Sequence, residues 1–450
     1  MAKAVRTEGS SKVAAQETEK RTRAEMERRT GKSAEDLYQE RDKRVRDAVQ
    51  LREPDRIPIH MPLGYFPCRH TGVSASAAFY DTVAWTDACR QTVLDYEPDE
   101  FTGTTGAGFD SGGALGILDA IPRRWPGGNL PPDAINQFVE AEYMKEDEYY
   151  LFLFDPSDFM LRFYLPRVFG ALEPLAKLPP IRSLSGTFFT SVVPLLATPE
   201  FQRVGQAILK AGQEKEKWRV GLSAFAEEMT RLGFPSADAV ANGCRPSAAF
   251  DIIACFLRCM GVYNDMHRRP DQLLAACDKI VEWQIRGALP ADPAKGRNPR
   301  VTGYPTHRSS DIWMSPAQFK TFYWPSLKKA LLTNSSLGYV TSLNFQGKSE
   351  SRLELFRELP RGSVIFRIDD PTDMPRAKAV VGGYMCIMAS VPATLVQLGS
   401  PSEVEEFCKD LIAKYAKGGG LIITAASSLD TAKPENVKVV CDTVKKYGRY

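Results

Sequence analysis

The sequence predicts an α/β protein in which parallel strands alternate with crossover helices. Two observations support this class. In the C-terminal third, short apolar runs alternate with segments of helical periodicity. Elements that alternate in this way form a parallel sheet covered by helices, and their number fits a barrel. The length of 450 residues would allow several domains, but α/β barrels with insertions reach this size.

The first strand is expected at residues 57–61, followed by a helix at 81–96 and by a strand and loop within 101–116. Further helices are expected at residues 315–334, 351–359, 373–381, 402–416 and 434–447. Further strands are expected at residues 338–345, 363–368, 384–388 and 421–424. The triple glycine at 418–420 lacks the Lys-Ser/Thr of a phosphate-binding loop, so we interpret it as the end of a helix.

Residues 1–45 form a charged, polar N-terminal extension with few large apolar side chains. Such a segment can bury little surface, so we expect it to be partly disordered, and we expect residues 1–32 not to dock. It passes into a charged helix at about residues 33–51. Residues 46–450 are expected to form one barrel, with a helical cap inserted within about residues 125–290, where helical periodicity dominates.

Composition excludes several classes of function. Hydrophobic residues make up 43% of the chain, charged residues 25%, and the net charge is +3. Because no basic face stands out, we expect no nucleic-acid partner. No apolar run is long enough for a bilayer and the N-terminus does not resemble a secretory signal, so no membrane partner is expected. The nine cysteines form no C-x-x-C pair, which indicates reduced thiols and a cytoplasmic protein.

Several motifs occur in a characteristic order. A helix, a Pro54-Asp55-Arg56 turn and a strand open the ordered region. The later markers are residues 316–325, 370–373, 399–404, 418–420 and 433–436. From about residue 44 to residue 448 this series resembles the uroporphyrinogen decarboxylase superfamily, which includes porphyrinogen decarboxylases and methyltransferases that work with corrinoid proteins. The resemblance implies a (β/α)8 TIM barrel with its active site at the C-terminal ends of the strands.

The methyltransferase branch of this superfamily holds zinc with a His-x-Cys pair and a later Cys. The corresponding positions here are Asn344, Gln346 and Ser427. Neutral amides and hydroxyls are poor zinc ligands compared with thiolate, imidazole or carboxylate. We therefore expect no metal site and no tightly bound cofactor. Any cobalamin is expected on a partner corrinoid protein.

Strand-end residues of a parallel barrel meet on one rim, and this geometry selects the candidate site. His307 and Asp370 are predicted to be catalytic, because an imidazole and a carboxylate can exchange protons with a substrate. The predicted substrate-binding residues are His60, Tyr65, Asp110, Arg308, Asp311, Asn344, Gln346, Ser390 and Ser427. The structural alternatives are a hydrogen-bonded core histidine for His60 and a helix cap for Asp370.

Three functions stay open. The sequence favours the substrate-side component of a corrinoid-dependent methyltransferase system acting on a small organic substrate, and the aromatic-rich cap suits an apolar or aromatic molecule. The second is a porphyrinogen decarboxylase, a lyase of tetrapyrrole biosynthesis, although the loop at residues 61–68 has no Arg for substrate carboxylates. The third is a non-catalytic barrel scaffold for a corrinoid protein. A homodimer is also compatible with the sequence.

Overall fold

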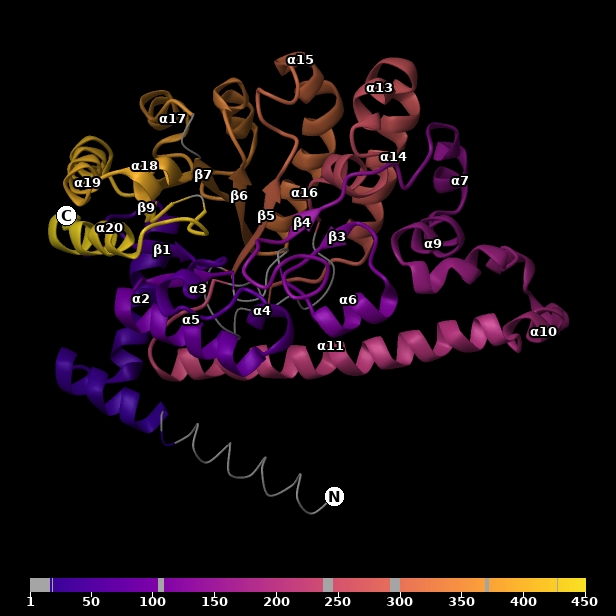
Figure 1. Cartoon of the computed structure of the whole chain (residues 1–450). Coiled ribbons are helices and arrows are strands. Elements are labelled where there is room, and N and C mark those ends of the chain that lie inside the picture. The colour runs from indigo at the N-terminus through magenta and orange to yellow at the C-terminus, as the bar shows by residue number, and fades with distance from the viewer. Residues whose placement is uncertain are drawn as a thin grey trace.

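A parallel seven-stranded sheet forms the centre of the protein (Figure 1). The computed structural model describes residues 17, 19–103, 109–237, 246–291, 300–368, 372–426 and 428–450. The strand order is β2 (Glu100–Thr102), β1 (Ile59–Pro62), β9 (Leu421–Thr424), β8 (Cys386–Ser390), β7 (Val364–Ile368), β6 (Tyr339–Phe345) and β5 (Arg300–Thr306). The last strand in the chain, β9, pairs with the first, β1, so that Ile423 lies opposite Ile59.

An eighth strand position lies beside β2. Phe101 forms a parallel bridge with Ser236, and the N–H of Ala237 donates to the carbonyl of Phe101 at 2.8 Å. This segment falls between β2 and β5 in the chain, which is the place of the third strand in a (β/α)8 barrel. Its continuation at residues 238–245 lies outside the described residues. The expected α/β barrel fold is confirmed.

Helices follow the strands in the expected order and cover the outside of the barrel. They include α5 (Thr82–Tyr96), α16 (Trp324–Ser336), α17 (Met374–Val381), α19 (Pro401–Tyr415) and α20 (Pro434–Tyr447). The expected helix over 351–359 is instead a 3-10 helix, η8 (Glu350–Glu358), which spans more length per residue than an α-helix. None of the helices in the described ranges combines the length and apolar character that a membrane span requires.

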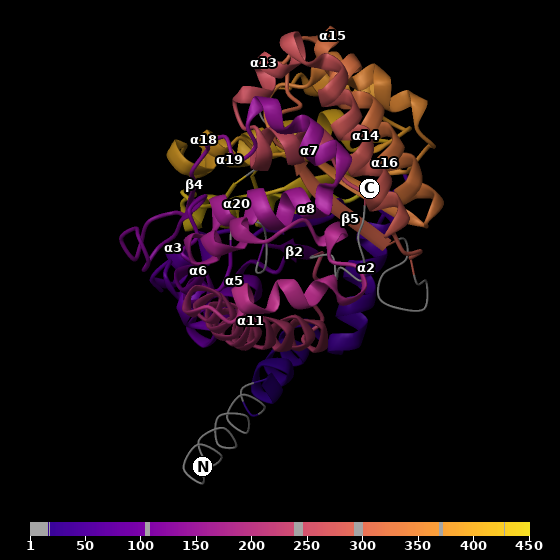
Figure 2. The same cartoon turned by 90° about the vertical axis from the view of Figure 1, so that its right-hand side faces the viewer.

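A long connection, residues 103–234, separates β2 from the next strand position. It contains α6 (Gly112–Leu118), the hairpin of β3 (Arg123–Arg124) and β4 (Gln137–Phe138), α7 (Tyr149–Phe154), α9 (Leu165–Val168) and α11 (Pro199–Arg231). Helix α11 runs along the edge of the molecule, packed against α5 and α6 (Figure 1), and is seen nearly end-on in Figure 2. The expected limits of the cap, 125–290, stay a prediction.

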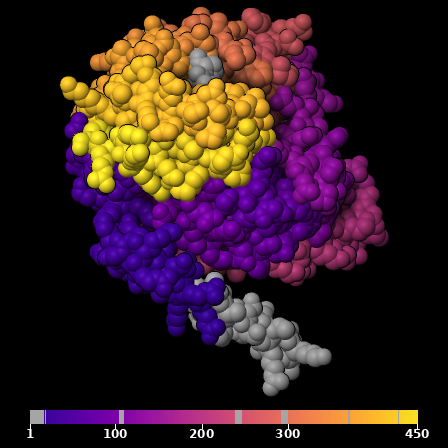
Figure 3. Space-filling model, turned by 60° about the vertical axis from the view of Figure 1, so that its left-hand side comes forward, coloured from indigo at the N-terminus to yellow at the C-terminus, as the bar shows by residue number. Residues whose placement is uncertain are grey.

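The N-terminal region packs against the barrel. Helix α2 (Ala34–Val49) covers the N-terminal ends of the strands, where Val45 belongs to one apolar cluster with Ile422. Residues 19–30 are also helical, and Figure 3 shows N-terminal residues, in indigo, lying against the rest of the molecule. Met26 is only 3% exposed. The expectation that this segment does not dock is wrong, because Met26 supplies an apolar contact that the charged composition concealed.

The Pro54-Asp55-Arg56 turn locks α2 to the first two strands. Arg44 of α2 binds Asp55 at 2.6 Å and Asp99 at 2.5 Å, while Arg56 binds Asp99 at 2.7 Å. Burial raises the pKa of the Asp99 carboxyl, but Arg56 and Arg44 outweigh it and hold that pKa below its usual value. Gly419 approaches the same corner with φ +70°, and a Cβ there would lie 2.4 Å from the carbonyl oxygen of Arg52.

Candidate functional site

A cavity of about 440 Å³ lies at the C-terminal end of β5, against the β3–β4 hairpin. Six of its lining side chains are aromatic, and they come from the long connection, from η6 (Ile253–Leu257) and from the loop after β5. These aromatic residues are Phe138, Tyr143, Tyr164, Phe169, Phe256 and Trp313. The polar and charged lining residues are Asp110, Arg123, Glu140, His307, Arg308 and Gln346. A mostly apolar cavity with a few polar groups is typical of small-molecule sites.

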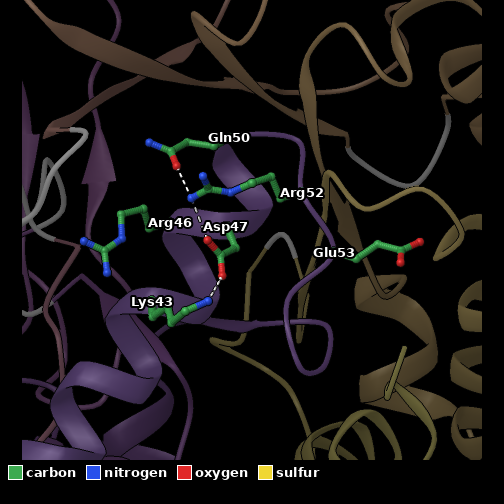
Figure 4. Close-up of a pocket in the computed structure, with 6 residues that line it drawn as sticks. All are labelled: Lys43, Arg46, Asp47, Gln50, Arg52 and Glu53. Atoms are coloured by element: carbon green, nitrogen blue, oxygen red, sulfur yellow. Dashed lines mark hydrogen bonds and ion pairs between the residues drawn. The ribbon is translucent and has the colours of Figure 1, made fainter.

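A second hollow lies at the opposite end of the barrel, on α2 and the loop after it (Figure 4). Three of its charged groups pair with one another, since Asp47 binds Lys43 and also Arg52, which in turn binds Gln50. Active sites of α/β barrels lie at the C-terminal ends of the strands, whereas the N-terminal end serves stability. We therefore place the functional site in the cavity at β5.

His307 follows β5 and is fixed at two points. Its Nδ1 lies 2.8 Å from Oε1 of Gln346, the residue after β6. Its main-chain N–H donates to the Asp251 carboxylate at 2.6 Å. When Nδ1–H donates to Gln346, the other ring nitrogen, Nε2, is available to a molecule in the cavity. The structure thus brings together two predicted site residues, His307 and Gln346.

Asp251 supports the candidate site and was missed by the sequence reasoning. It belongs to α12 (Ala249–Ile252), is 5% exposed, and accepts hydrogen bonds from the N–H groups of His307 and Arg308 and from the hydroxyl of Tyr323. Burial raises the pKa of its carboxyl, while His307 and the donated hydrogen bonds oppose that shift. The sequence did contain an indication of its role, since Asp251 lies in the most apolar stretch of the chain. A carboxylate buried there needs specific hydrogen-bond partners.

Arg308 lies against the aromatic wall of the cavity. Its guanidinium sits 4.2 Å from the centre of the Trp313 ring, and Nη2 forms an ion pair with Glu140. The buried Nε atom has no hydrogen-bond partner. Burial lowers the pKa of Arg308, but Glu140, Cys255 and Tyr263 outweigh it and raise the pKa overall. Burial also raises the pKa of the Cys255 thiol, to about 12, so this thiol is a poor nucleophile.

Asp110 and Arg123 line the cavity on the side of the long connection. Asp110 accepts from the N–H of Ser111 at 2.7 Å and forms an ion pair with Lys215. Arg123 lies 5.1 Å from the centre of the Phe138 ring, and burial lowers the pKa of its guanidinium. The predicted residue Asp110 therefore reaches the cavity, although from outside the barrel strands.

Three other predicted residues lie away from the cavity. His60 binds Glu100 through Nδ1 at 2.8 Å and Thr102 through Nε2 at 3.3 Å, as a hydrogen-bonded core histidine does. The hydroxyl of Tyr65 donates to Asn136 at 2.7 Å. Asp311 accepts from the hydroxyl of Ser351 and lies 3.3 Å from Nη2 of Arg352, so it ties the loop after β5 to η8.

The remaining predicted residues divide into two groups. Asn344 and Ser390 stand near the C-terminal ends of β6 and β8, and the buried Oδ1 of Asn344 and Oγ of Ser390 have no hydrogen-bond partner. They do not line the cavity beside His307. Asp370 and Ser427 lie outside the described residues, so their predicted roles stay predictions.

Comparison with known proteins relates the part of the chain that contains His307 to a protein family. Residues 248–447 match the family model described as uroporphyrinogen decarboxylase (URO-D). This region is therefore similar to URO-D domains. The family resemblance of the sequence motifs is thereby confirmed.

A methyltransferase from Methanosarcina mazei has a similar solved structure, with a TM-score of 0.52 and 11% sequence identity. The match covers 90% of this chain and 98% of that chain. At this identity the likeness shows the fold alone. No curated protein matches the sequence.

The donor groups of the URO-D domain do not suit zinc. Asn344 and Gln346 offer neutral amides in place of the imidazole and thiolate that zinc prefers. Among the described residues, no group of three His, Cys, Asp or Glu side chains is placed to hold a metal ion. We therefore derive no step through a metal.

Proposed function

We propose that this URO-D-like protein is the substrate-side methyltransferase of a corrinoid-dependent system, and that the aromatic cavity at β5 binds the methylated substrate. The observation that carries the proposal is His307 at the end of β5, facing a cavity with aromatic walls. The volume of about 440 Å³ is in the lower half of the range of roughly 300–1,000 Å³ for small-molecule sites. Such a cavity suits one small organic molecule better than a tetrapyrrole with its side chains.

In this proposal the protein's own residues orient the substrate and supply a proton. The aromatic walls hold the apolar body of the substrate. When its methyl group leaves, the oxygen or nitrogen that carried it keeps the electron pair of the broken bond. His307 enters this step doubly protonated, with Nδ1–H donating to Gln346, and it gives its Nε2 proton to that atom to become a neutral imidazole. A corrinoid carried by a partner protein would accept the methyl group. Asp370, which lies outside the described residues, is proposed from the sequence as a second proton-handling residue.

Porphyrinogen decarboxylation receives less support from the site. A porphyrinogen carries several carboxylates, which require several cationic partners. Among the described residues that line the cavity, the groups able to carry positive charge are Arg123, Arg308 and His307. Two acidic residues, Asp110 and Glu140, line it as well. This charge pattern and the aromatic walls favour a smaller, less charged molecule.

The substitution His307→Gln tests the proposal, because it keeps a polar side chain but removes the proton donor. We expect methyl transfer from methoxylated or methylated aromatic donors to cob(I)alamin to fall by about 10²–10⁴-fold, the usual contribution of general acid catalysis. The melting temperature should stay unchanged. The matched control is His267→Gln on α13 (Gly261–Arg268), an exposed histidine outside the cavity. Full turnover by the His307 variant would remove this residue from the mechanism.

We further propose that the reaction uses no protein-bound zinc. The positions of Asn344 and Gln346 carry the argument, since neither amide can replace a thiolate or imidazole ligand. Metal analysis of protein expressed with added zinc should find no stoichiometric metal. One tightly bound zinc per chain would contradict the proposal.

A further inference from the structure

A short segment of the long connection lies across the cavity and contacts Arg308. This strap, residues 139–144, follows β4. Its first N–H, of Val139, donates to Pro122, and its last, of Met144, donates to Leu257 at 2.8 Å. Between these anchors, Glu140 binds Arg308 and Glu142 binds Arg258 at 3.0 Å. The strap is therefore held to the barrel side by two carboxylate–guanidinium pairs, of which only the Glu140 pair lies at the cavity.

The two partners in the Glu140–Arg308 pair differ in environment. The side chain of Arg308 is 8% exposed, whereas that of Glu140 is 44% exposed. A buried guanidinium loses hydration and is stabilised when its donors are filled, yet Nε of Arg308 has no partner. A carboxylate that approached from the cavity could use Nε and one Nη together, which is the preferred two-pronged geometry for arginine.

We infer that the substrate is an aromatic monocarboxylate, and that its carboxylate replaces Glu140 on Arg308. Glu140 then acts as an internal substitute that fills the anion site until the ligand arrives. The ring of the ligand would lie among Phe138, Phe169 and Trp313. Asp110 on another wall is already paired with Lys215 and would offer no attraction to a second anionic group. This inference rests on the proposed function in that it names the substrate class for the same cavity.

Two ligands of nearly the same shape, one anionic and one neutral, test the anion site in the full-length protein. Calorimetric titration should show that para-methoxybenzoate binds about tenfold or more tightly than neutral para-methoxybenzamide, as expected for a hydrogen bond to a charged group. The substitution Arg308→Gln should abolish this preference. Equal affinities of the wild-type protein for the two ligands would overturn the inference.

Two substitutions in the strap test the replacement step and leave Arg308 intact. Glu140→Gln removes the competing carboxylate, so para-methoxybenzoate should bind roughly two- to fivefold more tightly, the range that release of a half-exposed ion pair allows. Glu142→Gln is the matched control, because it breaks the neighbouring ion pair outside the cavity. Its affinity should equal that of the wild type. Weaker binding by the Glu140 variant, or equal tightening by both variants, would overturn the inference.

These titrations need no methyl acceptor, so the two proposals can fail separately. Binding with the expected charge preference, but without any methyl transfer to a corrinoid, would support the anion site and reject the proposed function. Methyl transfer from neutral methoxyarenes, with no preference for a carboxylate, would support the proposed function and reject the anion site.

Discussion

The buried carboxylate of Asp251 accepts a 2.6 Å hydrogen bond from the main-chain N–H of His307. The two residues are 56 positions apart in the chain, and the bond fixes the backbone where β5 ends. The same carboxylate also accepts from Arg308 at 3.1 Å. One buried residue thus fixes the backbone from which two side chains enter the cavity, those of the proposed proton donor, His307, and of the proposed anion-binding residue, Arg308.

Asp251→Asn should therefore impair both stability and the site. The side-chain NH2 of Asn would face the N–H and O–H groups that now donate to the carboxylate. At least one buried donor would then have no acceptor, at a cost of about 1–3 kcal/mol. We expect urea unfolding to show that loss, together with weaker ligand binding in the cavity. Tyr323→Phe is the control, because it removes only the phenol donor to Asp251. It should cost about 0.5–1.5 kcal/mol and leave binding unchanged. A fully stable, fully binding Asn variant would contradict this role.

Asp99→Asn should destabilise the barrel by about 3–5 kcal/mol, because it leaves the buried Arg44 and the partly buried Arg56 short of a charge partner. Asp55→Asn is a matched control, since Asp55 binds the same Arg44 but has a side chain that is 65% exposed. That change should cost at most about 1 kcal/mol. Denaturant unfolding of the two variants measures the difference, and similar losses would contradict the prediction.

The Asp99 carboxyl also makes the stability of the protein depend on pH. Arg56 and Arg44 hold the pKa of Asp99 below its usual value in the folded state. Its contribution is therefore fully present above the unfolded-state pKa of about 3.9 and is lost as the pH falls through the lower folded-state pKa. Below about pH 4, the unfolding free energy of the wild type should fall more steeply than that of Asp99→Asn. Parallel curves would show that Asp99 does not titrate with unfolding.

Cys255 lines the cavity but should not react as a free thiol. Burial raises its pKa to about 12, so at pH 8 only about 10⁻⁴ of it is thiolate, whereas an ordinary thiol of pKa about 8.5 is roughly one quarter ionised. Iodoacetamide labelling, followed by mass spectrometry of the Cys255 peptide, should be about 10³-fold slower in the native protein than in the denatured chain. Equal rates would make this thiol a candidate nucleophile.

Met26→Ala should cost about 2–5 kcal/mol, the usual effect of truncating a buried Met. Met26 is 3% exposed within the main apolar cluster. Glu25→Ala on the same helical segment is the control, because Glu25 is exposed and such changes usually stay within about 0.5 kcal/mol. Equal melting temperatures for Met26→Ala and the wild type would show that the segment does not contribute to folding.

The sequence predicted the C-terminal half of the barrel well because each strand there is a short apolar run between clear helical periods. The strand at residues 421–424 and the helix at 434–447 have the expected limits. The third strand position, near Ser236, had no such pattern and was found only through its bridge to Phe101. Local patterns report the burial of a segment, and they do not report which distant strand it pairs with.

The candidate site was predicted in part. Selecting the residues that follow predicted strands identified His307, Arg308 and Gln346, because such residues of a parallel barrel meet on one rim. It could not find Glu140 or the aromatic residues Phe138, Tyr143, Tyr164 and Phe169, since these come from the long connection and not from the ends of the barrel strands. It also selected Asp311, whose side chain stabilises a loop. A residue's place after a strand fixes where its backbone lies, but the partner that its side chain meets depends on the connections.

The pairing of β9 with β1 affects how the chain can fold as it is synthesised. Strand β1 leaves the ribosome early, yet one of its edges stays unpaired until residues 421–424 emerge. An open strand edge invites pairing with other chains. Contacts between such distant segments also form slowly, because a long loop must close first. A nascent chain that stops before β9 should therefore be prone to aggregation, and chaperones that shield strand edges should matter most during that interval.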